Sequence, residues 1–165
     1  MSVIDLDDSD RFTRVLLLDV PWAHTWADKA DRQRRENYRA AALDSLQPQP
    51  ANTLWWAFRI TVAKAGRQLD LDNVPKTIID AFCTRQIVRD GSQHTELGLY
   101  PDDSLDHVRV VYLAGAPGAA DRTRIEIFAC TADPATGPPG FAAGCQTAVP
   151  QSGHEFDGGT ARGAR

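Results

Sequence analysis

The chain lacks any long hydrophobic run. Its 165 residues include no apolar segment approaching the roughly 20 residues that a membrane-spanning helix needs. Residues 1–10 are polar and acidic, which is the wrong charge for a secretory or mitochondrial signal. We therefore predict a cytoplasmic protein that has no membrane among its partners.

Cysteine and histidine are both scarce. The three cysteines, Cys83, Cys130 and Cys145, are an odd number without close spacing, which argues against a disulfide framework or a zinc knuckle. We expect free thiols, with Cys83 and Cys130 as small core residues. The four histidines are scattered without ligand-like spacing, so we expect structural or solvated roles for them.

The chain also lacks the surplus of basic residues that nucleic-acid binders usually carry. It has 22 acidic against 18 basic residues and a net charge of -4. A DNA partner therefore requires a local concentration of basic side chains. Two groups of residues provide such a concentration. The first group lies on the first predicted helix and consists of Lys29, Arg32, Arg34, Arg35 and Arg39. The second group flanks a cluster of aspartates and consists of Lys64, Arg67, Arg85 and Arg89. The helix group also fits a solvated face that acidic neighbours on the same helix balance.

The length and composition indicate one compact domain. A hydrophobic fraction of 42% is adequate for a globular core. Apolar periodicity, turn residues and prolines then predict the secondary structure. We expect strands at 12–20, 53–64, 97–100, 105–113 and 124–131, helices at 28–46 and 73–84, a strand end at 69–72 and an exposed loop at 85–96.

This element order predicts a small α/β (α+β) fold, a mixed sheet with helices packed on it. The last two strands flank a turn-rich segment, which favours an antiparallel hairpin. Residues 11–132 would form the domain. Residues 1–10 are interpreted as a disordered acidic leader, and residues 133–165, rich in Gly and Pro, as a disordered tail.

Acidic residues cluster where the second strand is followed by a helix. Asp70 and Asp72 would point to the same side of an extended segment, since side chains alternate there. Asp72 also serves as a helix N-cap, and Lys76 and Asp80 then follow at one-turn intervals on one helix face. A later pair, Asp102 and Asp103, lies in a turn. Carboxylates in such numbers favour a hard cation such as Mg²⁺.

Each of these features also has an ordinary structural explanation. Aspartate is common at helix N-caps, Lys–Asp pairs four residues apart are common on helix surfaces, and two aspartates after a proline form a routine turn. From the spacing alone, a metal site and a purely structural role both stay open.

Two segments carry a family resemblance. Residues 70–82 (DLDNVPKTIIDAF) resemble the DxDN…K…D signature of the RusA family of Holliday junction resolvases, and residues 98–103 (GLYPDD) look like that family's short strand running into an acidic turn. Residues 108–112 and 124–127 are similar to its closing strands. The resemblance covers about residues 53–131; the segment 85–96 looks inserted, and the aromatic residues 21–26 differ from the family's polar loop.

The resemblance implies a function. It suggests a RusA-like fold and a homodimer that nicks opposed strands of branched, four-way DNA junctions in recombination and repair, using Mg²⁺ or Mn²⁺. Residue by residue, it implies that Asp70, Asp72, Lys76 and Asp103 are catalytic. The metal would be held by Asp70, Asp72 and Asp103, with Asp102 in support, and Asp80 would also have a supporting role.

The basic residues around this cluster complete the expected site. We expect Lys64, Arg67, Asn73, Arg85 and Arg89 to bind DNA. Two other functions stay open: a DNA-binding or interaction module that kept the fold without catalysis, and a metal-dependent hydrolase acting on nucleotides. The hypothesis requires carboxylates from distant parts of the chain to converge on one cation.

Overall fold

A computed structural model describes residues 4–24, 30–67 and 69–132 of the chain. The strands in it are β1 (Phe12–Val20), β2 (Trp55–Lys64), β3 (Val108–Pro117) and β4 (Arg122–Cys130). The helices are α1 (Asp31–Ala42), α2 (Val74–Ala81) and α3 (Thr84–Asp90), with short 3-10 turns at Leu43–Ser45, Leu71–Asn73 and Thr95–Leu97.

The four strands form one mixed sheet in the order β1-β4-β2-β3. β4 is antiparallel to both β1 and β2, whereas β3 is parallel to β2. The predicted hairpin of the last two strands is therefore wrong, because β2 lies between β3 and β4. The burial pattern gives the reason: β4 is buried on both faces along most of its length, which suits a central position, whereas β3 is largely exposed.

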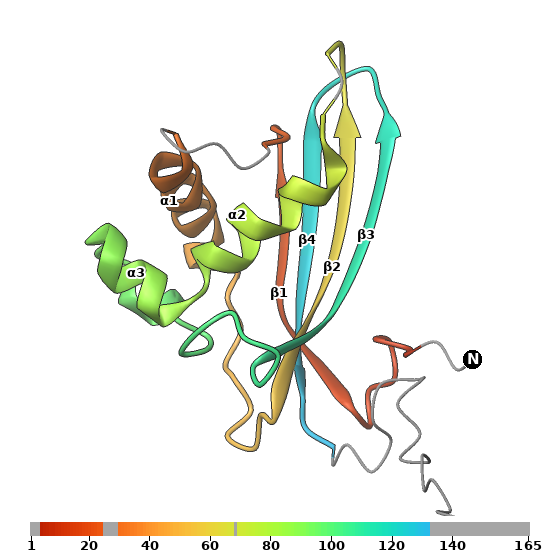
Figure 1. Cartoon of the computed structure of the whole chain (residues 1–165). Helices are drawn as coiled ribbons and strands as arrows, with labels where there is room; N and C mark the ends of the chain where they lie inside the picture. Colours follow the sequence, from red (N-terminus) through yellow and green to blue (C-terminus); the bar gives the residue numbers. More distant parts are fainter. Residues whose placement is uncertain (1–3, 25–29, 68, 133–165) are drawn as a thin grey trace, which may run out of the picture.

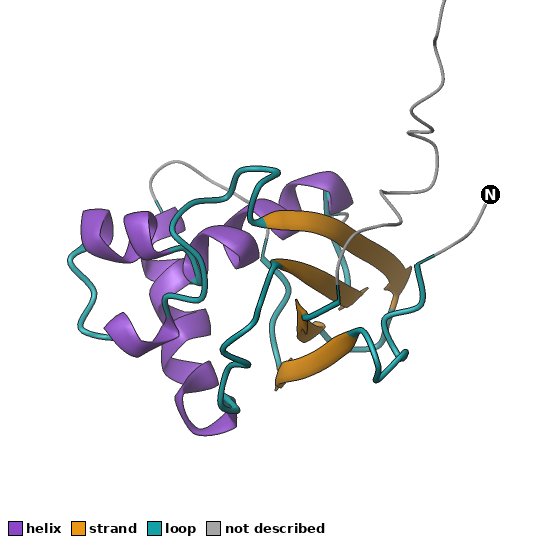
Figure 2. Cartoon of the chain, turned by 90° about the horizontal axis from the view of Figure 1, so that it is seen from below, coloured by secondary structure: helices purple, strands orange, loops and turns teal. Residues whose placement is uncertain are grey.

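The helices cover one face of the sheet (Figures 1 and 2). The main core lies between this face and helices α1 and α2, where Tyr38, Phe58 and Ile78 are fully buried. The predicted α/β architecture, a mixed sheet with helices packed on it, is confirmed. Among the described residues, no helix has the length and apolar character to cross a membrane.

A second, smaller core covers the other face of the sheet. Leu6 is only 2% exposed and packs with Phe12, Trp55 and Phe128. The hydroxyl of Tyr112 donates a hydrogen bond to the carbonyl of Ile4 at 2.6 Å. Ile4 and Leu6 therefore pack on the sheet, within the segment predicted as a disordered leader, whose residues 1–3 lie outside the described residues. The predicted tail, 133–165, lies outside the described residues.

The segment between the second strand and the third differs most from the prediction. Residues 69–72 form no strand end, because Leu71–Asn73 is a 3-10 turn, and the N-cap of α2 is Asn73 rather than Asp72. Pro75 lies in the first turn of α2, as expected.

The predicted loop 85–96 is also wrong in its first half, since α3 occupies it. α3 forms because Ile87 packs in the core and Asp90 is buried against arginines of α1. The expected strand 97–100 is reduced to a single bridge between Cys83 and Tyr100.

Candidate functional site

Asp70 lies at the end of the fold where β2 and β3 finish. It is exposed, and it lines a cavity of about 310 Å³ together with Lys64 and Arg67. We call this the strand-end cavity; its other lining residues are Val62, Gly66, Leu69, Leu71, Gly115, Ala116 and Pro117. Asp72 is exposed in the adjoining 3-10 turn. Two carboxylates and two basic residues of the predicted site thus meet at this end.

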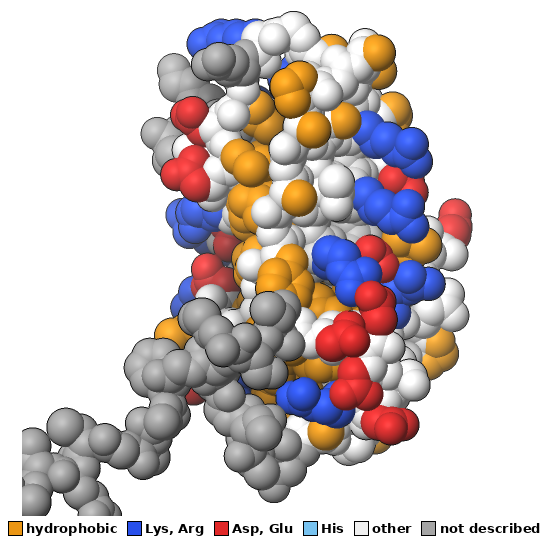
Figure 3. Space-filling view, turned by 90° about the vertical axis from the view of Figure 1, so that its right-hand side faces the viewer, with side chains coloured by type: hydrophobic (Ala, Val, Ile, Leu, Met, Phe, Trp, Pro, Cys, Tyr) orange, Lys and Arg blue, Asp and Glu red, His pale blue; other side chains and the backbone are white. Residues whose placement is uncertain are grey.

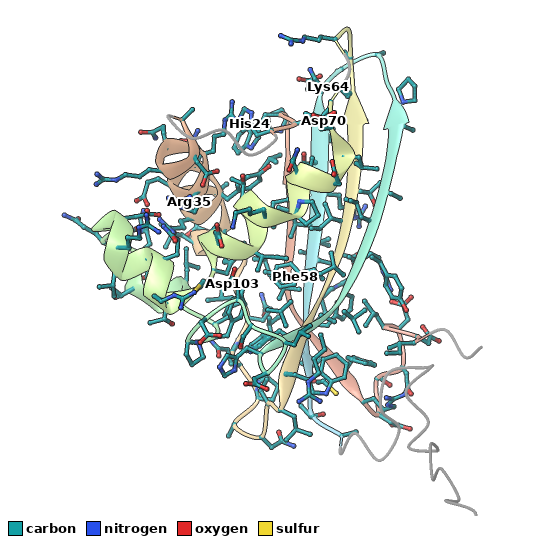
Figure 4. The ribbon with its side chains drawn as sticks, viewed as in Figure 1. His24, Arg35, Phe58, Lys64, Asp70 and Asp103 are labelled. Atoms are coloured by element: carbon teal, nitrogen blue, oxygen red, sulfur yellow. The ribbon has the colours of Figure 1, made fainter. Side chains whose placement is uncertain are left out.

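Asp103 lies elsewhere, at the junction of α2 and α3. It lines a cavity of about 410 Å³ together with Lys76 and Asp80 of α2. We call this the helical cavity; its other lining residues are Asp31, Arg32, Arg35, Cys83, Arg85, Gln86 and Arg89. Figure 4 shows Asp70 and Asp103 near opposite ends of α2. The predicted site residues therefore fall into two groups.

Sheet topology explains the separation. Asp103 precedes β3, and Asp70 lies against the last residues of the same strand. β3 has 10 residues, which corresponds to roughly 30 Å of extended chain. Within the described residues, no group of three His, Cys, Asp or Glu side chains is placed to hold a metal ion. A single copy of the chain does not bring Asp70, Asp72 and Asp103 together.

Each carboxylate of the helical cavity has a cationic neighbour. Lys76 Nζ lies 3.5 Å from Asp80 Oδ2, and Arg85 Nη2 donates a hydrogen bond to Asp103 Oδ1 at 3.1 Å. Burial raises the pKa of Asp80 above its ordinary value; the charge of Asp103 adds to the rise, whereas Lys76 and Arg35 oppose it. Asp80 and Asp103 are therefore close enough to influence each other electrostatically.

Asp102 takes no part in either cavity. Its Oδ1 accepts a hydrogen bond from the Ser104 backbone N–H at 3.0 Å and lies 3.9 Å from His107 Nε2. Hydrogen bonds from Ser104, with smaller contributions from His107 and Arg85, hold the pKa of Asp102 below its ordinary value. In a single chain this aspartate stabilises the turn, which was the structural alternative for the acidic pair.

The predicted DNA-binding residues divide in the same way. Arg67 is exposed at the strand-end cavity, where Lys64 forms an ion pair with Asp121 at 2.7 Å. Asn73 is half-buried at the start of α2, while Arg85 and Arg89 line the helical cavity.

A buried ionic network that sequence reasoning missed fixes α3 to the rest of the domain. Arg35 donates from Nε and Nη2 to the two carboxylate oxygens of Asp90, each at 2.7 Å. Arg39, which is fully buried, pairs with Asp90 at 2.9 Å and donates to the Ala81 carbonyl at 2.7 Å. Arg35 also pairs with Asp31, which accepts a hydrogen bond from Thr77 at 2.8 Å.

This network joins all three helices. Although burial alone would raise it, hydrogen bonds from Arg35, Gln86 and Arg39 hold the pKa of Asp90 below its ordinary value, so Asp90 stays charged. The only sequence signal was the presence of arginines four residues apart on α1, which fits a solvated face equally well.

Within the described residues, no strand pairs with the outer edge of β3. The free edge of β1 is partly covered, since the Gln47 N–H donates to the Val15 carbonyl at 2.8 Å. On the β3 side Val111 is 39% exposed. Figure 3, which faces this side, shows a strip of hydrophobic side chains with charged groups beside it. An exposed edge strand with apolar neighbours is a ready surface for another strand.

Comparison with known proteins does not assign the chain to a family. A scan against protein-family models found no model that matches the chain, and a search of the curated proteins found no match.

Proposed function

We propose that this protein is a metal-dependent endonuclease of the RusA type that resolves four-way DNA junctions. The observation that carries the proposal is the helical cavity, in which Lys76, Asp80 and Asp103, all residues of the signature, lie together among arginines. A cavity with both carboxylates and cations suits a phosphodiester and the hard cation that accompanies it.

Because Asp70 and Asp103 are far apart in one chain, we infer that the active site forms in a homodimer. Pairing two β3 edges antiparallel reverses the direction of one copy relative to the other. The end that carries Asp103 in the second copy would then lie beside the end that carries Asp70 and Asp72 in the first. We infer that each active site combines Asp70 and Asp72 of one copy with Asp103 of the other. Two such sites would act on two opposed DNA strands.

The residues fit a divalent cation only in this combined form. A single chain offers no three-carboxylate group among its described residues, whereas Mg²⁺ takes one or two protein carboxylates and fills its other positions with water and phosphate. Asp70, Asp72 and Asp103 are the residues that would hold it. A divalent ion there supplies charge stabilisation to the phosphate under attack and activates water.

Lys76 has the clearest role among the residues of the chain itself. Its side chain is 54% exposed, and its ammonium group lies beside the carboxylate of Asp80. From this position it would offset the negative charge that develops on the phosphate during hydrolysis. Asp80 orients the lysine and does not itself contact the substrate in this proposal.

The absence of a three-carboxylate group in the described part of the chain also favours a second candidate. In it, the protein binds branched DNA through its basic residues without cutting it. The nuclease differs from this module in one measurable respect, which is cleavage.

A nicking assay on a synthetic four-way junction separates the candidates. Wild-type protein should release nicked strands with Mg²⁺ and none with EDTA, while a linear duplex of the same sequence stays intact. Binding of the junction without nicking supports the non-catalytic module. Hydrolysis of free nucleotides without junction cleavage supports a nucleotide hydrolase instead.

Mixing two inactive variants tests the shared site. Asp70→Asn and Asp103→Asn should each be inactive alone, because both composite sites of each homodimer lack a ligand. After subunit exchange, the mixed dimer has one complete site, with Asp70 from one variant and Asp103 from the other, so one strand is nicked. If the mixture stays as inactive as its components, the sites are not shared between copies.

A further inference from the structure

Helices α1 and α3 present two arginines for which the described part of the chain supplies no counterion. Arg32 on α1 and Arg89 on α3 are exposed and line the helical cavity. Neither has a hydrogen bond or an ion pair with another side chain within the described residues, unlike Arg85 and Lys76, which already neutralise Asp103 and Asp80. Unpaired arginines that share a cavity are suited to an anion with several negative groups.

The surface extends past the helical cavity. Arg32 also lines a second cavity of about 410 Å³, together with Gln33, Glu36, Asp90, Gly91, Ser92 and Gln93. A Cβ built on Gly91 would lie 3.9 Å from Arg32 Nη2, so the guanidinium reaches the end of α3. The two cavities adjoin at Arg32, the lining residue that they share, and we refer to them together as the groove between α1 and α3.

Buried contacts beneath the groove join α1 to α3. Asp90 closes α3 onto Arg35 and Arg39 of α1, so these two arginines are already neutralised within the domain. Gly91 ends α3 in the left-handed conformation, with φ of 65°, which glycine adopts without strain. The positions of Arg32 and Arg89 relative to each other therefore depend on Asp90.

We propose that this groove binds backbone phosphates of a nucleic-acid strand, next to the phosphate that is cut, and that Asp90 is the residue that positions it. The choice of nucleic acid rests on the proposed function, but the binding does not require cleavage. Asp90 acts through α3 and does not contact the strand. We call this groove, in which Arg32 and Arg89 are the cations without a described counterion, the basic groove.

The test measures binding in EDTA, where no cleavage occurs, by fluorescence anisotropy of a labelled four-way junction and of a linear duplex. Arg32→Ala and Arg89→Ala should each weaken binding about 3- to 10-fold and reduce the slope of log K against log salt by about 1. Arg122→Ala is the matched control, because it removes one arginine on β4 that pairs with Asp19 at 3.1 Å; it should change affinity by less than about 2-fold.

For Asp90→Asn, our proposal and a simple charge argument predict opposite changes in DNA affinity. Removing a negative charge from a DNA binder should strengthen binding, as Asp106→Asn on the exposed turn before β3 should do slightly. If Asp90 positions the groove, Asp90→Asn weakens binding instead, at a temperature where circular dichroism shows the variant folded. If that variant does not fold, the two arginine variants decide.

The outcomes separate this inference from the nuclease proposal. Arginine variants that bind like Arg122→Ala would overturn the basic groove even if the wild type cuts junctions. A wild-type protein that binds neither DNA probe overturns it as well. Loss of binding in the arginine variants supports the basic groove even if the wild type does not cleave junctions. Absence of cleavage by the wild type would contradict the nuclease proposal alone.

Discussion

The two cavities on either end of α2 are held in different ways. In the helical cavity, Asp80 is 8% exposed, and the residues around it are tied to buried arginine–carboxylate pairs. At the strand-end cavity, Asp70 and Asp72 are exposed on a short turn, and no described side chain holds them. The fold therefore fixes Asp80 by buried contacts, whereas no described side chain fixes Asp70 or Asp72.

This difference also separates two kinds of buried aspartate. Asp90 is matched by cations and its pKa is lowered, whereas the pKa of Asp80 is raised by burial and by Asp103. A lowered pKa marks a carboxylate whose charge stabilises the fold, and a raised pKa marks one whose charge is held at a cost. Substitutions at these residues test this contrast and the contrast between the two cavities.

Replacing Arg39 with methionine should have the largest effect on stability. The change removes a fully buried cation, leaves the Ala81 carbonyl without its side-chain donor, and takes from Asp90 one of its two arginine partners. We expect the free energy of unfolding to fall by about 3–5 kcal/mol, as for other broken buried pairs. Urea denaturation measures it, with Arg67→Met at the strand-end cavity as the control. Equal decreases in the free energy of unfolding in both variants would contradict the proposed difference between the two cavities.

Replacing Lys76 with alanine should lower junction nicking about 100-fold, on the scale seen when one donor to a transition-state charge is removed. The exposed lysine has little part in packing, so the melting temperature should stay within a few degrees. Single-turnover kinetics give the rate. Lys64→Ala, at the other cavity, is the matched control; because Lys64 pairs with Asp121, we expect a smaller effect. The reverse order of effects would assign the charge-stabilising role to Lys64 in place of Lys76.

Replacing Val111 with lysine should weaken the homodimer. Val111 lies on the open edge strand, and a two-fold axis there brings two added charges near each other. We expect the dimer dissociation constant to rise about 10-fold, which corresponds to about 1.4 kcal/mol. Light scattering over a dilution series measures it, with Val88→Lys on α3 as the control, since Val88 is 71% exposed and away from the edge. An unchanged constant would place the interface elsewhere.

Protonation at low pH should have opposite effects on the contributions of Asp90 and Asp80 to folding stability. The folded-state pKa of Asp90 is depressed, so its stabilisation is complete above the unfolded-state value of about 4 and is lost as the pH falls through the lower folded value. Asp80 has a raised pKa, so its charge opposes folding at neutral pH. Asp80→Asn should therefore stabilise the protein at pH 7 by on the order of 1 kcal/mol. Melting curves between pH 3 and pH 7 test both statements, and Asp80→Asn melting below the wild type at pH 7 would contradict the second.

Several features were predictable because they depend on local sequence. Strands β1 and β2 were expected from β-branched and aromatic runs, and both form within two residues of the expected bounds. The first turn of α2 was expected from Pro75, and the helix forms there. Periodicity and proline act over a few residues, so a sequence reports them directly.

The structure of residues 85–96, the segment that looked inserted, was harder to predict. Residues 85–96 contain few apolar side chains, which is typical of a loop, yet α3 forms there because Ile87 and Asp90 find partners on α1 and elsewhere in the core. The stabilising contacts join residues 55 positions apart. No local rule includes such partners, and the arginines of α1 gave no sign of which acid they would meet.

The sequence by itself determined the composition of the candidate site: the carboxylates, the lysine and the basic residues around them, together with an α/β architecture. The tertiary structure decided their distribution. β3 runs parallel to β2, since the chain between them crosses over through α2 and α3, and this direction places Asp70 and Asp103 near opposite ends of the same strand pair. Strand direction depends on pairing between distant segments, which no stretch of sequence specifies alone.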